Sequence, residues 1–194
     1  MISIKTNIAK FINSELRDIK NASTKATRSA TTKVARQGAT AGKRAVREYY
    51  TIPAAKLNEA TKIKSASSND SSAKIIVTGK KISLDYYHAL KNKFKSATVM
   101  IIKGRRVTMP GSKEAGTKSF VATMGNKHKG IFYRITKGKS THKSDPWRLP
   151  IKERMGPSAP DLMRSRHAID AIRTYVKTNY ERIFNNEYKY YKNK

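Results

Sequence analysis

The sequence predicts an α+β fold: a long N-terminal helical segment, an antiparallel β-sheet of four to six strands and a long C-terminal helix. Apolar residues recur at helical spacing over the first fifty residues, and again over the last forty. Between them lie three pairs of short β-rich runs. We expect two parts, a basic helical arm over residues 1–64 and an α+β domain with the C-terminal helix over residues 65–194.

The N-terminal segment is predicted to form one long helix or two helices in series. Its apolar stripe begins with large side chains and then thins to small ones, while many Thr and Ser residues lower its helix propensity. We therefore expect this segment to need a partner surface. The stripe consists of Ile4, Ile8, Phe11, Ile12, Leu16 and Ile19, followed by Ala30, Val34, Gly38, Ala41 and Ala45.

A row of basic residues falls within about half a turn on the opposite side of the same helix. Such a row is either an ordinary solvated helix face or a surface that faces phosphates or an acidic neighbour. The row consists of Lys25, Arg28, Lys33, Arg36, Lys43, Arg44 and Arg47.

A second helix is predicted from Pro53 to about Ile63, because proline suits the first helical position. The polar run SASSNDSS, residues 65–72, then marks the border between the arm and the sheet.

The middle of the chain is predicted to form hairpins. Residues 73–79 and 81–85 form the first pair, joined at Thr78-Gly79-Lys80, and residues 85–90 form a helical turn or the end of a strand. Residues 97–110 give a second pair around Lys103-Gly104-Arg105. Residues 119–124 and 130–136 give a third pair. Successive hairpins favour an antiparallel sheet.

The C-terminal region is predicted to be one helix with a frayed end. Asp161, directly after Pro160, suits the positive end of the helix dipole. The last ten residues, NNEYKYYKNK, lose the helical pattern, and their tyrosines and lysines form either a polar tail or a base-stacking surface. The helical pattern consists of Leu162, Ile169, Ile172, Val176, Tyr180 and Ile183.

The charge of the chain points to a polyanionic partner. Lys and Arg number 42 against 13 Asp and Glu, a formal net charge of +29. The excess is +10 in residues 1–64 and +19 in residues 65–194, so it is not confined to the arm. The chain has no Cys, which excludes disulfides and Cys-based zinc sites. No apolar run approaches the roughly 18 residues of a membrane span, and we expect synthesis in a cytoplasm.

No catalytic, cofactor-binding or metal-binding residue is predicted, and we expect a protein that is not an enzyme. The four histidines, His88, His128, His142 and His167, show no metal-site spacing. The 13 acidic residues are scattered, whereas a metal-dependent nuclease needs clustered carboxylates. Glycines occur singly and form no phosphate-binding loop.

From residue 118 onward, an ordered series of motifs resembles the lambda-like minor tail protein Z family, the tail completion proteins of long-tailed bacteriophages. A Phe-containing strand is followed by a Gly-aromatic-aromatic-Arg strand, a basic loop, an Arg-x-Pro-Ile step and a Gly-Pro-Ser-x-Pro turn before the last helix. The match covers about 45 residues. The matching residues are Phe120, Gly130, Phe132, Arg134, Arg148, Pro150, Ile151, Gly156, Pro157, Ser158 and Pro160.

The resemblance implies a structural virion protein at the tail top or neck. It would form a homo-oligomeric ring, expected to be a hexamer, between the tail tube or terminator and the connector proteins, around the path of double-stranded DNA. The prolines fix φ near −65°, so the turn is stiff. We expect it to be a surface loop that meets a neighbouring subunit, or a turn that only aims the last helix.

Two other classes remain open. One is a related head completion or tail terminator protein. The other is a cellular protein that binds nucleic acid without sequence specificity, although the chain has no aromatic-basic recognition motif and no helix-turn-helix spacing.

Overall fold

The structure is a computed structural model that describes residues 5–90, 96–112, 117–135 and 150–193, with the side chains of the first helix described from Glu15 onward. It divides into two compact units. The helical unit comprises residues up to 42 together with 61–76 and 169–194. The sheet unit comprises residues 43–60 and 77–168. These units differ from the predicted division into an arm over residues 1–64 and a domain over residues 65–194, because the C-terminal helix packs against the N-terminal helix and belongs to the same unit.

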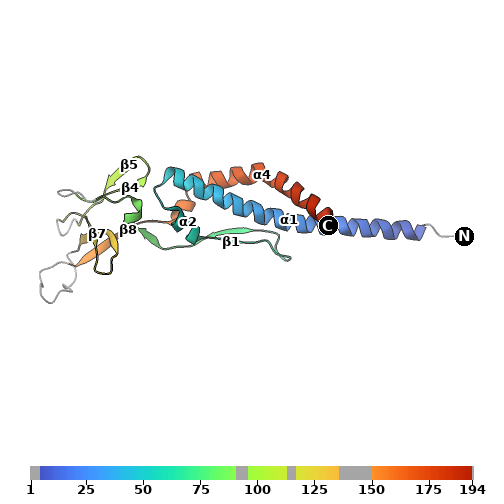
Figure 1. The fold of residues 1–194 in the computed structure, drawn as a ribbon, viewed down its shortest axis with the longest axis horizontal. Helices are drawn as coiled ribbons and strands as arrows, with labels where there is room; N and C mark the ends of the chain where they lie inside the picture. Colours follow the sequence, from blue (N-terminus) through green and yellow to red (C-terminus); the bar gives the residue numbers. More distant parts are fainter. Residues whose placement is uncertain (1–4, 91–95, 113–116, 136–149, 194) are drawn as a thin grey trace. The chain divides into compact units, whose positions relative to one another are not determined.

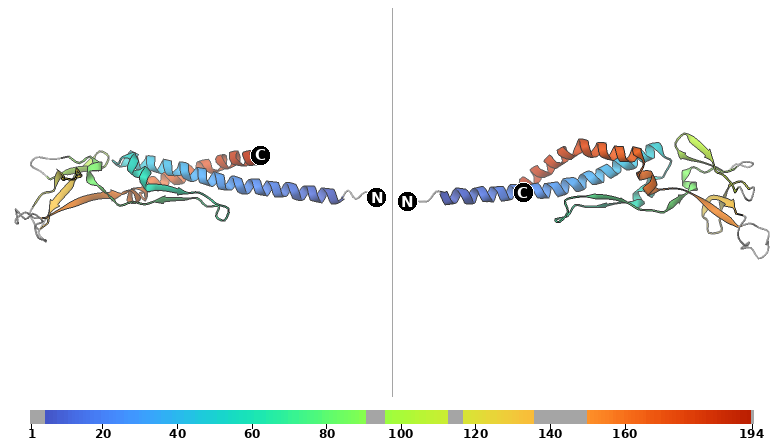
Figure 2. Two further views of the ribbon diagram at one scale, coloured as in Figure 1. Left: turned by 60° about the horizontal axis from the view of Figure 1, so that its bottom comes forward. Right: turned by 180° about the vertical axis from the view of Figure 1, so that it is seen from behind.

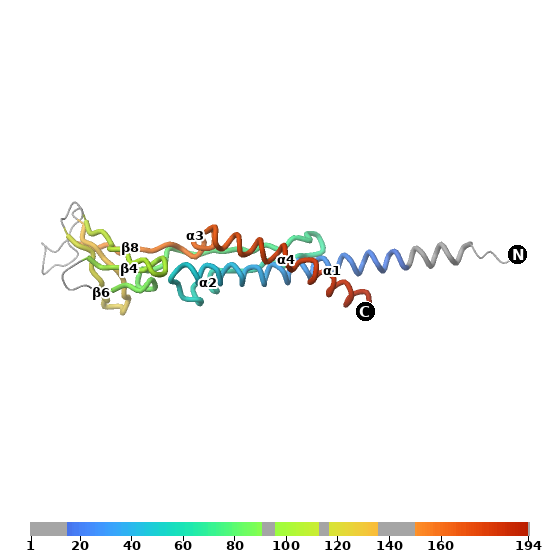
Figure 3. Tube along the Cα trace, turned by 90° about the horizontal axis from the view of Figure 1, so that it is seen from above, coloured from blue at the N-terminus to red at the C-terminus, as the bar shows by residue number. Residues whose placement is uncertain are grey.

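The helical unit is built on two long helices that lie side by side, α1 (Lys5–Tyr49) and α4 (Arg166–Lys192) (Figures 1 and 2). Figure 3 shows the same pair from a third direction. The helices are antiparallel, since Gly38 lies against Ile172 whereas Ala30 belongs to the cluster of Ile183. The N-terminal segment is therefore one continuous helix, and it has the partner surface that its thin stripe requires.

Small residues at every fourth position form the buried seam of α1. Ala41 and Ala45, which were expected on this seam, are only half-buried, and Gly42 and Val46 are buried in their place. A spacing of four residues advances about 400° along a helix, so the seam drifts about 40° per step away from a fixed face. The seam consists of Ala22, Ala26, Ala30, Val34, Gly38, Gly42 and Val46.

A two-stranded sheet, β1 (Thr61–Lys64) with β2 (Lys74–Val77), joins the two units in sequence. Its loop contacts α1 within the helical unit: the backbone N–H of Ala66 donates to Thr32 Oγ1 at 3.1 Å. Two expectations were wrong here. The helix α2 (Ala54–Ala60) ends before Ile63, and β2 pairs with β1 instead of forming a hairpin with residues 81–85. The alternation of Thr61 and Ile63 favours a strand over another helical turn.

The sheet unit contains an antiparallel four-stranded sheet with the order β3-β8-β7-β6 and a separate hairpin of β4 and β5. The hairpins predicted over 97–110 and 119–136 are confirmed, with Gly104 at a φ of 76° in the first turn. The α+β class is likewise confirmed. The remaining elements are β3 (Lys81–Ser83), the short 3-10 helix η1 (Leu84–Tyr87), β4 (Thr98–Ile102), β5 (Arg105–Thr108), β6 (Phe120–Thr123), β7 (Lys129–Arg134), β8 (Ile151–Ser158) and α3 (Ala159–Met163).

The proline-rich stretch is not the surface loop that we expected, because residues 151–158 form β8 between β3 and β7. The register changes between the pairs Lys81–Ser158 and Ser83–Met155, so that Gly156 and Pro157 both lie opposite Ile82. This is a β-bulge, a position where a strand tolerates a proline without an N–H group. The motif residue Arg148 and His142 lie outside the described residues, as does the whole of residues 136–149, where a basic loop is predicted.

The expected last helix is divided in two, since α3 ends at Met163 and α4 begins at Arg166. The expected fraying was also wrong: α4 remains helical to Lys192. Its last turns are held by contacts with α1 that the local sequence pattern does not reveal. Among the helices that the structure describes, none combines the length and apolar character needed to cross a membrane.

Candidate interaction surface

The first part of α1 continues beyond the C-terminal end of α4 (Figures 1 and 2). Residues 15–21 are all exposed. Leu16 is 58% exposed and Ile19 is 43% exposed, although both belong to the predicted apolar stripe. Within the described residues no other segment covers them. An amphipathic helix with an uncovered apolar stripe is suited to bind another surface.

A recess of about 450 Å³ lies where this exposed part of α1 meets the end of α4. Glu15, Asp18 and Ile19 line it from α1, and Tyr191 and Lys192 line it from α4. Lys25 also lines it, so the recess places two carboxylates, two ammonium groups and one exposed aliphatic side chain on the same surface. A surface with both signs of charge and an exposed aliphatic side chain is suited to a protein partner that presents complementary charges.

The buried carboxylate of Glu187 fixes the far end of α4 to α1. Ser29 Oγ donates to its Oε2 and Lys33 Nζ to its Oε1, each at 2.5 Å. Burial opposes the ionisation of Glu187, but the hydrogen bonds from Lys33 and Ser29 outweigh it, and the pKa of Glu187 is lowered. Glu187 was not among the predicted functional residues. A carboxylate on the apolar side of an otherwise basic helix is the signal that could have revealed it.

The basic row of α1 does not present all seven cations to solvent. Lys33 is paired with Glu187, Arg28 Nη2 donates to the carbonyl of Ser68 at 3.3 Å, and Lys43 Nζ donates to Asn58 Oδ1 at 2.7 Å. The four other members are exposed, and no described residue pairs with their side chains: Lys25, Arg36, Arg44 and Arg47. These four are the members of the row that remain available to an anion.

The Gly-Pro-Ser-x-Pro motif closes over a buried tyrosine. Tyr87 is completely buried, its hydroxyl donates to the carbonyl of Pro157 at 2.8 Å, and burial raises the pKa of its phenol. A Cβ at Gly156 would lie only 2.6 Å from Tyr87 Cε2 and 3.0 Å from Leu84 Cδ2. Glycine is thus required here by close approach. The role of Tyr87 could not be inferred from the sequence, because the contact is long-range.

Ser158 then begins α3 with a reciprocal cap. Its hydroxyl accepts from the backbone N–H of Asp161 at 3.3 Å, and the Asp161 carboxylate accepts from the backbone N–H of Ser158 at 2.9 Å. The hydrogen bond from the Ser158 side chain, reinforced by that from its backbone, lowers the pKa of Asp161. Pro160 lies within the first helical turn, as predicted for a helix start.

The motif residues on β7 pair directly with neighbouring strands. Phe132 pairs with Phe120 on β6 and, on its other side, with Glu153 on β8. The guanidinium of Arg134 lies 5.7 Å from the centre of the Phe120 ring. Gly130 is buried, whereas Pro150 is half-buried and Ile151 is 41% exposed. The structure therefore brings the motif residues of β6, β7 and β8 together on adjacent strands, while Pro160 follows them in α3.

A serine, a histidine and a glutamate meet beside this sheet, but they do not form a catalytic triad with an activated serine. Ser83 Oγ and His128 Nε2 both lie 2.9 Å from the same oxygen of Glu153. In a catalytic triad the histidine would lie between serine and carboxylate, to accept the hydroxyl proton. Here the carboxylate lies between them, so the arrangement holds strands together and does not activate Ser83. Within the described residues no cluster of three or more metal-binding side chains occurs.

The chain is thus an α+β protein whose exposed helix end and basic residues form candidate interaction surfaces. No family model, no curated protein and no solved structure matches it.

Proposed function

We propose that the protein is a structural component of a phage virion, a tail completion or neck protein. It would act as a homo-oligomeric ring between the tail tube and the connector, around the DNA path. The observation that carries the proposal is the exposure of Leu16 and Ile19 on the predicted apolar stripe of α1, close to the C-terminal end of its partner helix α4.

Assembly accounts for this stripe. Exposed Leu16 and Ile19 are unfavourable in a monomer, and burying an aliphatic side chain is worth about 1.5–3 kcal/mol. Glu15 and Asp18 lie at the same end of α1 as Arg17 and Lys20, so this end carries both signs of charge and can pair with complementary charges on another copy of the chain. A helix end that joins subunits is therefore favoured over one that only extends into solvent.

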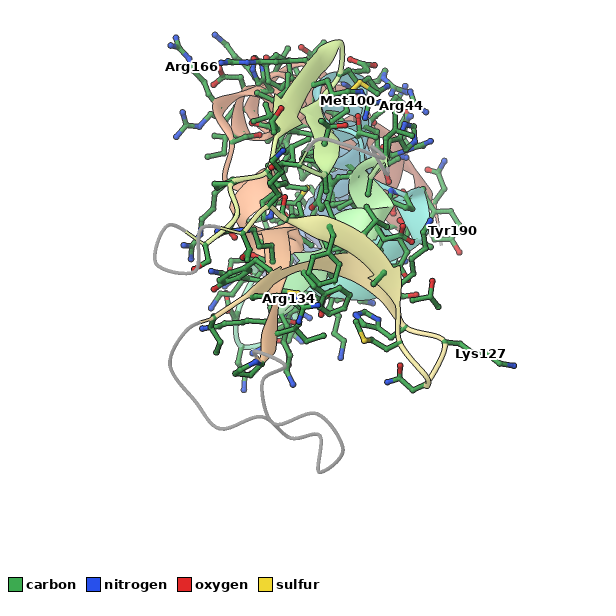
Figure 4. The ribbon with its side chains drawn as sticks, turned by 90° about the vertical axis from the view of Figure 1, so that its left-hand side faces the viewer. Arg44, Met100, Lys127, Arg134, Arg166 and Tyr190 are labelled. Atoms are coloured by element: carbon green, nitrogen blue, oxygen red, sulfur yellow. The ribbon has the colours of Figure 1, made fainter. Side chains whose placement is uncertain are left out.

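The distribution of positive charge is consistent with a DNA path. Lys25, Arg36, Arg44 and Arg47 are long exposed side chains on one helix, and such residues contact phosphate without reading base sequence. Exposed lysines also lie on other elements. Lys127, for example, extends from the tip of the turn between β6 and β7 (Figure 4).

The test changes Leu16 and Ile19 together to Glu and measures the oligomeric state by native mass spectrometry. We expect the wild-type chain to form a closed ring and the variant to be monomeric with unchanged helix content. A matched control changes Ile76 and Val107 to Glu, since each is 41% exposed and lies outside α1.

The control should form the ring normally. A wild-type chain that remains a folded monomer, both alone and in assembled tails viewed by electron microscopy, would contradict the proposal. A monomer that nevertheless binds duplex DNA tightly would favour the alternative of a cellular nucleic-acid-binding protein.

A further inference from the structure

A second recess lies entirely within the sheet unit, beside the open edge of the four-stranded sheet. Its volume is about 450 Å³. β3 is the terminal strand of the sheet, and no other described strand pairs with its outer edge. A terminal strand presents unpaired N–H and C=O groups, which another chain can use to add a strand.

The side chains around this edge are partly apolar and include three lysines, of which only Lys56 pairs with the one carboxylate of the recess, Glu59. Tyr86 is 42% exposed and Met155 is 44% exposed, and both line the recess. Lys81, the first residue of β3, and Lys80, directly before it, also line the recess, and both are exposed. The ammonium group of Lys56 lies 5.1 Å from the centre of the Tyr86 ring. The recess therefore combines an apolar floor with cations along its edge.

From this geometry we infer that the edge of β3 is a docking site for an extended acidic segment of a different protein. The segment adds to β3 as a further strand, its acidic side chains pair with the lysines, and its apolar side chains contact Tyr86 and Met155. An extended segment alternates its side chains between two faces, so acidic residues two positions apart lie on the same face.

A second copy of this chain does not supply such a segment. The closest acidic residues in its sequence, Glu15 and Asp18, are three positions apart, and no two lie at a spacing of two. Nucleic acid would satisfy the lysines, but it would leave the backbone groups of the β3 edge without strand partners. The surface is distinct from the α1 stripe that carries the proposed function, so the two proposals can fail independently.

The test uses a fluorescein-labelled peptide, Glu-Val-Glu-Val-Glu-Val-Glu, and fluorescence anisotropy with the full-length protein. We expect saturable binding. Two further peptides carry N-methyl groups on alternate amides, one on the odd and one on the even positions. Only one set of amides faces β3, so one peptide should bind at least tenfold more weakly and the other about as well as the parent.

Substitutions on the protein test the side chains. Changing Lys80 and Lys81 to Gln should weaken binding about fivefold, as expected for two exposed ion pairs. Y86A should also weaken binding. A matched control, Lys103 and Lys127 to Gln, removes the same charge from exposed sites outside the recess and should leave binding within about twofold.

Three results would overturn the inference. One is no binding of the parent peptide up to about 1 mM. Another is equal binding of both N-methylated peptides and the parent. The third is tighter binding of a single-stranded oligonucleotide of similar charge that depends on Lys80 and Lys81, which would assign the edge to nucleic acid.

Discussion

Replacing Gly156 by Ala should destabilise the sheet unit, although the backbone permits the change. Gly104 is the one glycine with positive φ among the described residues, so Gly156 is not strained by gaining a side chain. The new Cβ would instead lie 2.6 Å from Tyr87 Cε2, where carbon atoms normally approach to about 3.5–4.0 Å. The ring has little freedom to move, because it is fully buried and its hydroxyl is bonded to Pro157.

The magnitude follows from two opposing effects. Overpacking a core by a methyl group costs about 1–3 kcal/mol, and the lower entropy of the unfolded chain returns about 0.4–1 kcal/mol. We therefore expect G156A to lower the free energy of unfolding by about 1–2 kcal/mol, measured by urea denaturation followed by circular dichroism.

The same substitution at Gly38 provides a control of opposite sign. A Cβ there would lie 3.6 Å from Ile172 and Val176, an ordinary contact, and alanine is the better helix former by about 0.5–1 kcal/mol. G38A should therefore stabilise the chain. If G156A were as stable as wild type, the close approach of β8 to Tyr87 would not be a packing constraint. If G38A were destabilising, the seam of α1 would be tighter than described.

Three further predictions concern charge and capping. Because the pKa of Glu187 is lowered from 4.5 on folding, its stabilising effect is present above about pH 4.5 and is lost as the pH falls through the folded pKa. E187Q should therefore reduce the loss of stability at acidic pH in a profile of unfolding free energy against pH. At neutral pH the same substitution should cost about 1 kcal/mol. S158A removes the N-cap of α3 and should cost about 1 kcal/mol in thermal or urea unfolding, whereas S158T keeps the hydroxyl and should retain most of the cap. Changing Arg36, Arg44 and Arg47 together to Gln should reduce the log–log salt dependence of duplex DNA binding by about 2.7 if all three contact phosphate, and an unchanged slope would assign them to protein partners.

Local patterns were sufficient for much of the fold. The long helix follows from the spacing of its apolar residues. The two hairpins follow from their turn residues, Gly104 in one and residues 124–128 in the other. The helix start at Pro160 and Asp161 follows from capping, so all of these features depend on only a few neighbouring residues. The two motif strands that contain Phe120 and Phe132 were also placed correctly, although pairing alone does not test the function that the motif suggests.

Long-range pairing was not predictable in the same way. The run 81–85 looked like the second strand of a hairpin, but β3 pairs with β8, more than seventy positions later in the chain. The strand β8 was missed because Gly156 and Pro157 are typical of turns, and only a β-bulge makes them compatible with a strand. The anchoring of α4 through Glu187 was also not predictable from local patterns, because its partners Ser29 and Lys33 lie far away in the sequence, on α1.

Pairing within the chain leaves most of the positive charge available to partners, because 42 Lys and Arg residues face only 13 Asp and Glu residues. Several carboxylates are occupied within the chain: Glu187 binds Ser29 and Lys33, Glu153 accepts from Ser83 and lies against His128, and Asp161 caps α3. All three accept from a neutral serine hydroxyl, and only Glu187 also pairs with a lysine, so these three carboxylates neutralise few of the cations. Many exposed lysines and arginines therefore keep their charge for an external anion. A control for the arginine triple variant, with Lys62, Lys103 and Lys127 changed to Gln, separates the general effect of net charge from that of the α1 row. If both variants change the salt slope equally, the attraction is a property of the whole surface; if only the arginine variant does, α1 is the element that faces the DNA.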